Sequence, residues 1–477
     1  MKMTKYKLGE LVEVTRGASL SGQFYAEEGK LIRLTLGNFN MNGGGFKENT
    51  SKTDLYFTGT VRDEFILNKG DIITPLTEQS LGLLGTTARI PESGKYIQSQ
   101  DVALVRCKKG LLDPNFCYYL ISSSIVRQQL SAAAQQTKIR HTSPEKIKDC
   151  TVWVPDFDVQ KNIGRILTDI DNKIAINRQI NDNLEAMAKQ LYDYWFVQFD
   201  FPNEEGKPYK SNGGVMVWNE KLKREIPQGW SDCVLGDYIG RITNGLNPRK
   251  NFVLGSGNNY YVTIRSLVGT TIDWNNCDRC DDEALSKINS RSQLQIGDII
   301  FSAIGTIGRT YYILEEPTNW NISETSFTLR AKENIPNDFF YGMLRSNEIR
   351  IKADKAAMGS TLRCLVMDSL CSLQYIEIPS YMMKLFATKV SPLYRQIHRN
   401  NKEIAELTKQ RDELLPLLMN GQASVNYHLS AKVYPLPIAY KKAMLIVANQ
   451  TISNTFIQKF DNHTPSPCLQ TSQIRCS

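Results

Sequence analysis

The sequence predicts an α+β fold in which two similar mixed α/β domains are separated by two long antiparallel helices that pair as a coiled coil. Residues 161–196 and 384–421 each carry apolar side chains at alternating steps of four and three, the spacing of a heptad seam. The second stretch repeats the first about 223 positions later, and short motifs in the preceding segments repeat at nearly the same distance. The chain is therefore expected to be a pseudo-two-fold internal repeat.

The first long helix is predicted over residues 161–196, which span about 54 Å at about 1.5 Å per residue. A helix of this length cannot bury its apolar stripe within one small domain, so the stripe is expected to pack against a second helix. The alternative is that both stripes belong to the cores of ordinary globular domains, and strict heptads over several turns argue against it. The seam residues selected for the pair are Ile174, Asn177, Leu184, Leu191, Ile397, Asn400, Leu407 and Leu414.

Two features qualify the second seam. Asn177 and Asn400 occupy equivalent positions, and because a buried asparagine fixes register at a cost in stability, they are expected to face each other. Pro392 and Pro416 fall inside the second stretch. Because proline breaks a helix interior, the regular helix is predicted from near Ser391 to near Leu415, otherwise with a kink or a short preceding helix.

The globular segments repeat each other as well. Leu8-Gly9-Glu10 recurs as Leu235-Gly236-Asp237, and the KGDII of 69–73 recurs as the IGDII of 296–300. Each Gly-Asp turn is followed by apolar residues, which predicts a strand. Further strands are predicted at 102–106 and 326–330, and helices from Asp113 to about 130 and from Pro336 to about 355, with Asp113 as an N-cap.

These patterns give the domain boundaries. A first globular domain is predicted at 1–158, a first long helix at 159–199, a linker at 200–228, a second globular domain at 229–381, a second long helix at 382–421 and an atypical tail at 422–477. The linker is rich in Gly, Pro, Asn and Lys, with a short ordered segment expected around 215–218. The tail has no counterpart after the first helix and is predicted to be disordered.

Composition limits the possible classes of function. The chain has 477 residues with a net charge of +8 and a sequence pI of about 8.8, which suits a polyanionic partner. The first residues lack the apolar core of a signal peptide, and no run of apolar residues is long enough to span a membrane. The ten scattered cysteines fit a reducing cytoplasm. We therefore expect a cytoplasmic globular protein without a membrane partner.

Catalytic and metal motifs are not found in the sequence. It lacks an Asn/Asp-Pro-Pro-aromatic loop and a GxxxxGK[ST] nucleotide loop, and the Gly-rich segment 254–259 is interpreted as a surface turn. Cys277 and Cys280 form a single CxxC without a second pair, so loop thiols are favoured over zinc. The four histidines show no ligand spacing. We predict no catalytic residue and no metal site.

One stretch resembles a known family. LEAMAKQLYDYWFVQFDFPNEEGKPYKSNGG (184–214), followed by IPQGW (226–230), is similar to the specificity subunit of Type I restriction–modification systems, and ELLPLLMNG (413–421) is also family-like. The resemblance covers about residues 5–421. The Gly-Ser-Thr at 359–361 resembles a recurring family element, whereas the first half has Gln-Gln-Thr at 135–137, so no role is carried over to the first two of those positions.

The resemblance implies a non-catalytic subunit. Each domain would recognise one half of a split site in double-stranded DNA, while the helices would set the spacer and dock methyltransferase subunits, two of them in the expected complex. No cofactor is expected in this chain: S-adenosylmethionine would be bound by the methyltransferase partner, and Mg²⁺ and ATP by endonuclease subunits. The alternatives are a protein scaffold that uses the helices without sequence-specific DNA recognition, and a detached recognition module of a single-chain enzyme.

DNA contacts are expected from basic or polar residues in turns, because phosphate contacts supply affinity and base contacts supply specificity. Arg140 and Arg363 occupy equivalent positions in the two halves and are the strongest pair. A solvated surface charge is the simpler interpretation for each single residue. The candidates are Arg16, Lys138, Arg140, His141, Arg241, Thr361 and Arg363.

Overall fold

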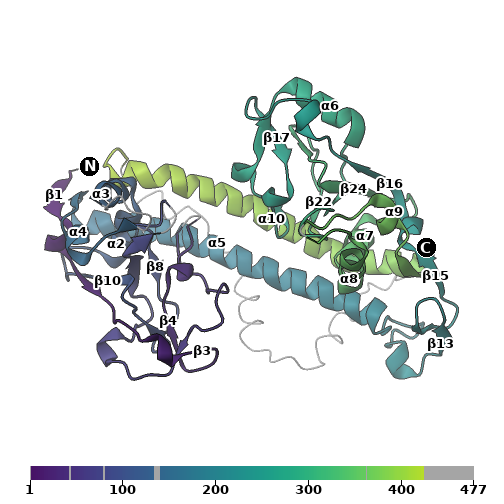
Figure 1. Cartoon of the computed structure of the whole chain (residues 1–477), viewed down its shortest axis with the longest axis horizontal. Coiled ribbons are helices and arrows are strands. Elements are labelled where there is room, and N and C mark those ends of the chain that lie inside the picture. The colour runs from purple at the N-terminus through teal and green to yellow at the C-terminus, as the bar shows by residue number, and fades with distance from the viewer. Residues whose placement is uncertain (1, 42–43, 79–80, 134–139, 361, 424–477) are drawn as a thin grey trace, which may run out of the picture.

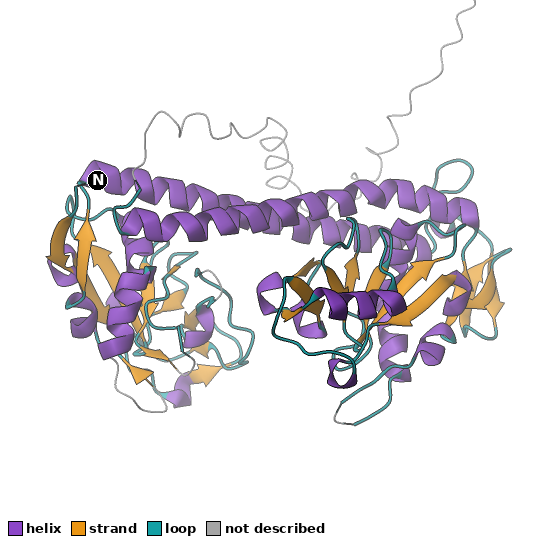
Figure 2. Ribbon diagram, turned by 90° about the horizontal axis from the view of Figure 1, so that it is seen from above, coloured by secondary structure: helices purple, strands orange, loops and turns teal. Residues whose placement is uncertain are grey.

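The computed structural model describes residues 2–41, 44–78, 81–133, 140–360 and 362–423. Two globular domains are joined by two long helices, α5 (Phe157–Tyr192) and α10 (Ser380–Met419). The helices run side by side in opposite directions, with one domain at each end of the pair (Figure 1). Figure 2 shows both domains on the same side of the pair. The predicted α+β architecture with an antiparallel helix pair is confirmed.

The prediction that prolines confine the second helix was wrong. α10 is one continuous helix of 40 residues that includes Pro392 and Pro416. Proline removes one backbone donor and frees the carbonyl four residues earlier. Pro392 and Thr388, whose carbonyl is freed, both lie on the exposed face, and Pro416 is exposed as well. Water can therefore satisfy the freed carbonyl, while the buried stripe holds the helix on both sides of Pro392.

α5 ends differently from α10. It has 36 residues and passes into a π-helical turn at Asp193–Val197. The linker predicted at 200–228 is ordered: strands β13 (Met216–Asn219) and β14 (Arg224–Pro227) form an antiparallel hairpin. Rings of this segment stack on the second domain, because Phe201 lies 5.0 Å from Trp230 between ring centroids. The chain therefore enters the second domain through a folded connection. Of the predicted tail, residues 424–477 lie outside the described residues.

The first domain has a four-stranded antiparallel sheet at its centre, in the order β2-β10-β6-β8. A second, mixed sheet has the order β3-β5-β4-β9. The elements of this domain are β1 (Thr4–Lys7), α1 (Leu8–Leu11), β2 (Val12–Arg16), β3 (Tyr25–Ala26), β4 (Leu31–Arg33), β5 (Tyr56–Phe57), β6 (Ile72–Pro75), β7 (Thr77–Glu78), β8 (Ala88–Arg89), β9 (Tyr96–Ile97), β10 (Val102–Cys107), α2 (Pro114–Ser122), α3 (Ser124–Ala133), β11 (Arg140–His141), α4 (Pro144–Lys148) and β12 (Thr151–Val154).

The second domain repeats the central sheet in the order β16-β24-β21-β22, beside a three-stranded sheet in the order β20-β17-β23. Its elements are β15 (Ser231–Val234), β16 (Ile239–Asn244), β17 (Asn259–Val262), β18 (Leu267–Val268), β19 (Thr271–Ile272), β20 (Asp278–Cys280), α6 (Asp282–Ser292), β21 (Ile299–Ser302), β22 (Thr310–Tyr312), β23 (Trp320–Ile322), β24 (Ser326–Ala331), α7 (Asn337–Leu344), α8 (Asn347–Ala356), α9 (Met367–Cys371) and β25 (Gln374–Glu377). The central sheets of the two domains therefore have equivalent strand orders.

The helices that follow the central sheets are each divided in two. The backbone N–H of Phe116 donates to the Asp113 carboxylate, as expected for an N-cap, but α2 ends before Ser123 and α3 follows. In the second domain α8 begins after Ser346, whose hydroxyl accepts from the Ile349 N–H. Ser123 and Ser346 are equivalent in the repeat. Serine favours capping over a helix interior, which explains why each predicted single helix is two.

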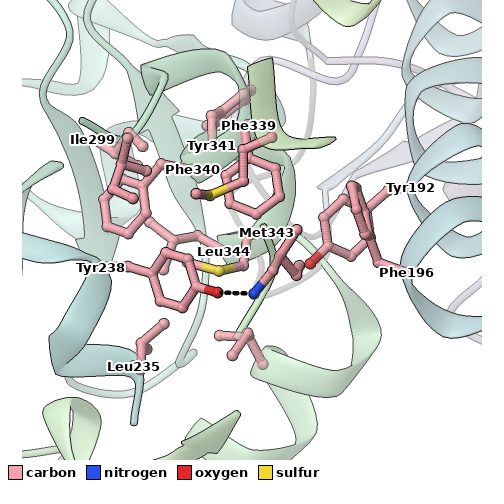
Figure 3. Packing of buried hydrophobic residues seen from close by; sticks show 14 of the residues in the cluster. Tyr192, Phe196, Leu235, Tyr238, Ile299, Phe339, Phe340, Tyr341, Met343 and Leu344 are labelled. Atoms are coloured by element: carbon pink, nitrogen blue, oxygen red, sulfur yellow. Dashed lines mark hydrogen bonds between the residues drawn. The ribbon is translucent and has the colours of Figure 1, made fainter. Parts of the chain in front are cut away.

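The second domain is joined to the helix pair by an aromatic core. Tyr192 from α5, Phe196 from the π-helical turn and Phe386 from α10 are buried against Phe339 of α7. Figure 3 shows Tyr192 and Phe196 beside the α7 side chains, with the Ile378 N–H donating to the Tyr238 hydroxyl. Buried aromatic side chains contribute large apolar areas, so this domain and the helices share one core.

Candidate nucleic-acid interface

The helix pair positions the two domains through its seam. Ile174 and Ile397 are buried, and Leu184, Leu191, Leu407 and Leu414 are half-buried. The last turn of α10 also enters the core of the first domain, where Leu418 and Met419 are buried. Each end of the pair is thus fixed in a domain core, and the separation of the domains follows from the helix lengths.

A polar layer interrupts the seam near its middle. Asn400 Nδ2 donates to Asn181 Oδ1 at 2.8 Å, and Asn181 Nδ2 donates to Asn401 Oδ1 at 2.8 Å. Asn177 instead donates to Glu403 Oε2 at 2.8 Å. The expectation that Asn177 faces Asn400 was therefore wrong. In an antiparallel pair, equivalent residues meet only at the two-fold axis, and these asparagines lie to either side of it.

Glu403 is the charged member of this layer. It accepts from Asn177 and forms an ion pair with Lys173. Burial raises the pKa of Glu403, but the hydrogen bonds from Lys173 and Asn177 and the Lys173 charge outweigh burial and hold the pKa below its usual value. The carboxylate is therefore ionised in the assembled pair.

At the first domain, polar contacts cross from domain to helix pair at Asp171. Its carboxylate accepts from the Tyr119 hydroxyl at 2.7 Å and from Arg411 of α10 at 2.9 Å. Burial and the Asp171 carboxylate raise the pKa of Tyr119, so the phenol remains a donor. One carboxylate thereby joins α2, α5 and α10.

At the second domain, Glu185 of α5 links the domain to the helix pair, as Asp171 does at the first domain. Its carboxylate accepts from Arg345 at 2.5 Å and from the Thr270 hydroxyl at 3.1 Å. Glu315 binds Lys402 of α10 at 2.6 Å, and Lys402 together with His398, whose Nε2 lies 3.1 Å from the carboxylate, lowers the pKa of Glu315. Both domains are therefore tied to the helices by charged contacts as well as by apolar packing.

Arg140 has an internal partner. Its guanidinium forms an ion pair with Glu78 at 3.0 Å, and the Glu78 side chain is only 2% exposed. Arg140 also donates to the carbonyl and hydroxyl of Ser131. His141, next along β11, is exposed and pairs with Thr77 of β7. The strand thus places the arginine inward and leaves the histidine accessible.

Arg363 repeats part of this arrangement. It donates to the carbonyls of Asp354 and Ala357 and forms an ion pair with the Asp354 carboxylate at 3.2 Å. Asp354 is the repeat equivalent of Ser131, so each arginine binds the last turn of the preceding helix. The Arg363 Nε is buried without a hydrogen-bond partner among the described residues.

The remaining DNA candidates are not gathered at one place. Arg16 donates to the Gln100 carbonyl at 2.9 Å. Arg241 donates to Gln293 at 3.0 Å and to the Arg291 carbonyl at 3.1 Å. Lys138 and Thr361 lie outside the described residues. DNA contact by these seven residues stays a prediction.

Sequence reasoning missed two glycine loops. Gly82 and Gly85 in the first domain have equivalents in Gly305 and Gly308, and all four have positive φ. The signal was present, because a Gly-x-x-Gly pattern recurs at the same 223-residue distance as the helix seams. Glycine is strongly favoured where the backbone takes this left-handed conformation, which fits the recurrence of both glycines in the two halves.

Of the two CxxC cysteines, Cys277 is half-buried and Cys280 is buried. Cys280 is the last residue of β20, and Cys277 immediately precedes that strand. Burial raises the pKa of both thiols. Among the described residues, no group of three or more His, Cys, Asp or Glu side chains is arranged to hold a metal ion. None of the helices in the described ranges combines the length and apolar composition of a bilayer span.

Comparisons with known proteins identify relatives. The family model of the Type I restriction modification DNA specificity domain matches residues 1–186. The specificity subunit of the Type I restriction enzyme MjaIX from Methanocaldococcus jannaschii is 26% identical over 325 residues, covering 67% of this chain and 71% of the relative. The HindI specificity subunit of Haemophilus influenzae is 21% identical over 378 residues, covering 69% and 81%.

The fold also has a solved counterpart. The crystal structure of the Type-I restriction-modification system S subunit from M. genitalium has a TM-score of 0.55 and 17% identity, covering 88% of this chain and 96% of that one. This similarity supports the shared architecture of two domains and a helix pair. The match of the family model and the similarity to the two specificity subunits bear out the resemblance noted in the sequence.

Proposed function

We propose that this chain, whose residues 1–186 match the Type I restriction modification DNA specificity domain, is a DNA-recognition subunit of a Type I restriction–modification complex. Each globular domain recognises one half of a bipartite site, and the helix pair sets the unread spacer. The observation that carries this function is the placement of two domains with equivalent central sheets at opposite ends, and on one side, of a rigid pair (Figure 2). Two pseudo-symmetric domains can meet two half-sites on one duplex.

The similarities and differences between the domains suit this division of labour. The central sheets share one strand order, whereas the second sheets differ: one has four strands and the other three. A common framework places each domain on the helices, and the divergent sheet and its loops supply different base contacts. The net charge of +8 favours a phosphate backbone as partner.

The protein partners follow from the same assignment. The helices and the folded connection dock methyltransferase subunits, two in the complex, and endonuclease subunits join them. Tyr381 and Leu385 of α10 are exposed apolar side chains that support such a contact. S-adenosylmethionine belongs to the methyltransferase partner, and Mg²⁺ and ATP belong to the endonuclease partner. This chain contributes recognition and no catalytic group.

The decisive experiment is co-expression of the full chain with its methyltransferase subunit, followed by single-molecule sequencing of the methylated DNA. A split motif with modified adenines on both sides of a fixed gap is the expected result. A stable complex with an active methyltransferase but no methylated motif would contradict DNA recognition and would favour a scaffold.

The spacer role has its own test. Seven residues inserted into each helix near the polar layer, beside Gln179 and Lys402, keep the seam in phase. They lengthen the pair by about 10 Å, which corresponds to about three base pairs at about 3.4 Å each. The gap in the methylated motif is expected to grow accordingly. Insertion into α5 alone serves as the control and is expected to impair folding, and an unchanged gap in the matched variant would exclude the spacer role.

A further inference from the structure

The glycine loop of the first domain, residues 82–85, binds the carboxylate of Glu78. The backbone N–H groups of Gly82, Leu83 and Leu84 all donate to Glu78 Oε2, at 3.2, 2.9 and 3.0 Å. The other carboxylate oxygen pairs with Arg140. Successive N–H groups around a turn form a concave site that suits an anion. In this loop the anion is the buried side chain of Glu78.

The second domain has the same loop without this carboxylate. Gly305 and Gly308 have φ angles of +78° and +84°, close to the +99° and +79° of Gly82 and Gly85. The Gly305 N–H donates to the Arg363 carbonyl and the Gly308 N–H to the Ser302 carbonyl. The N–H groups of Thr306 and Ile307, the equivalents of Leu83 and Leu84, have no partner within the part of the chain that the structure describes.

A difference in loop length explains the missing carboxylate. The first domain has residues 76–81 between the end of β6 and its first loop glycine, whereas the second domain has only 303–304 between β21 and Gly305. Glu78 lies in the longer connection. The shorter one provides no carboxylate. The Ser302 hydroxyl at the end of β21 turns into the loop instead, where it accepts from the Arg309 N–H at 2.8 Å and donates to the Thr306 carbonyl, and it leaves the Thr306 and Ile307 N–H groups without a partner among the described residues.

The second loop borders a hollow of about 620 Å³ between the domain and α5. Its charged lining residues are Lys189, Arg309, Arg345 and Arg350, against the single carboxylate of Glu185. Arg345 and Lys189 already have ion-pair partners. The exposed Arg350 guanidinium has none among the described residues, and its Cγ lies 3.3 Å from the position of a Cβ built on Gly308.

From these contacts we infer that the Gly305–Arg309 loop and Arg350 bind a phosphate group of the DNA backbone. The inference rests on the proposed function and assigns to one loop a contact that is independent of base sequence. An oxyanion would accept from the free N–H groups of Thr306 and Ile307 and would pair with Arg350. It would also pair with Arg309, one nitrogen of which already donates to the Ile264 and Leu267 carbonyls at 3.2 Å. It would occupy the place that Glu78 occupies in the first domain. Arginine and backbone donors together favour phosphate because several charge-assisted bonds form at once.

The two halves provide a matched experiment. Arg350→Gln removes the charge beside the open loop, and Arg127→Gln removes its repeat equivalent beside the filled loop, where Arg127 donates to the Gly82 carbonyl. The affinity of the full chain, with its methyltransferase subunits, for a duplex carrying the methylated motif is measured over a range of salt concentrations. Each phosphate contact adds about 0.9 to the slope of log K against log salt.

Arg350→Gln is expected to lower that slope by about 0.9 and Arg127→Gln to leave it unchanged. A second variant, Thr306→Glu, supplies a carboxylate to the open loop and is expected to lower the slope as well. An Arg350→Gln slope equal to that of the wild type, or equal losses for Arg350→Gln and Arg127→Gln, would overturn the assignment. Loss of affinity at an unchanged slope would also overturn it, because it indicates a structural role.

Inorganic phosphate separates this inference from the proposed function. At constant ionic strength, phosphate in place of chloride is expected to raise the melting temperature of the wild type more than that of Arg350→Gln, because general salt exclusion stabilises both proteins and binding at the loop stabilises only the wild type. If the wild-type complex does not bind DNA, the proposed function is wrong, and the loop cannot be a site for a DNA phosphate. If DNA binds but phosphate stabilises both proteins equally and the slopes agree, only the phosphate site is excluded.

Discussion

The first and second domains have equivalent central sheets but differ in what is attached to them. β2-β10-β6-β8 and β16-β24-β21-β22 have corresponding orders, and each is followed by two helices divided at an equivalent serine. The second sheets differ in strand number, and the counterpart of α6 in the first domain is only a single 3₁₀ turn, Asp63–Phe65. The shared parts fix each domain to the helix pair. Under the proposed function, the divergent parts would recognise the different half-sites.

The comparison extends to how each domain satisfies its polar groups. The first loop is closed by Glu78 and Arg140, while the second is open beside a cationic hollow. The second domain is joined to the helices by more aromatic rings, among them Phe339 and Phe386. A duplicated framework can thus keep its geometry while the two copies differ in stability and in the ligands they accept.

The largest effect is expected in the aromatic core. Phe386→Ala should destabilise the protein by about 3–5 kcal/mol, because it leaves a cavity among Tyr192, Trp195 and Phe196. The equivalent change in the first half, Ile163→Ala, should lower the free energy of unfolding by an amount near the lower end of about 2–5 kcal/mol. Chemical unfolding of the full chain measures both. A larger loss of stability for Ile163→Ala than for Phe386→Ala would contradict the stronger packing of the second domain against the helices.

The filled loop gives the next effect. Glu78→Ala should cost about 3–5 kcal/mol, because it leaves the half-buried Arg140 and three backbone donors without their carboxylate. Glu28→Ala, at an exposed position of the same domain, should stay within about 0.5 kcal/mol. Thermal unfolding distinguishes them, and equal melting temperatures would show that Glu78 does not hold the loop.

The polar layer should contribute less. Asn181→Ala removes hydrogen bonds to Asn400 and Asn401 and should cost about 1–2 kcal/mol. Asn172→Ala, on the exposed face of the same helix, is the control and should be neutral or slightly stabilising because alanine favours helix. An equal loss in both variants would indicate an effect on helix propensity rather than on the contact between the helices.

The smallest effect concerns pH and the second domain only. Because Lys402 and His398 lower the pKa of Glu315 in the folded chain, its stabilising contribution is present above the unfolded pKa of about 4.3. This contribution is lost as pH falls through the lower folded value. Glu315→Gln should lower the melting temperature slightly at pH 6 and have no effect near pH 3, with a contribution below about 1 kcal/mol for this half-exposed pair. A constant difference at both pH values would contradict this.

Much of the architecture could be predicted from local pattern. Alternating steps of four and three give both long helices, because an uninterrupted apolar stripe on a long helix must find a partner. The Gly-Asp turns before Ile72 and Ile299 locate central strands of both sheets, and Asp113 marks a helix start. The candidate site was less predictable. Arg140 and Arg363 were found as an equivalent pair, but the sequence did not reveal that both bind the preceding helix.

The sequence by itself determined the duplication and the presence of two long amphipathic helices, because periodicity and motif spacing are properties of the linear chain. Only the tertiary structure decided which residues meet. Asn181 rather than Asn177 contacts Asn400 because the helices are antiparallel, and Pro392 is tolerated because the carbonyl it frees faces solvent. The Glu78 carboxylate accepts from three N–H groups of one glycine loop, whereas no carboxylate among the described residues does so in the other. Such pairings depend on how distant segments pack, and a small difference in loop length changed the outcome between two nearly equivalent domains.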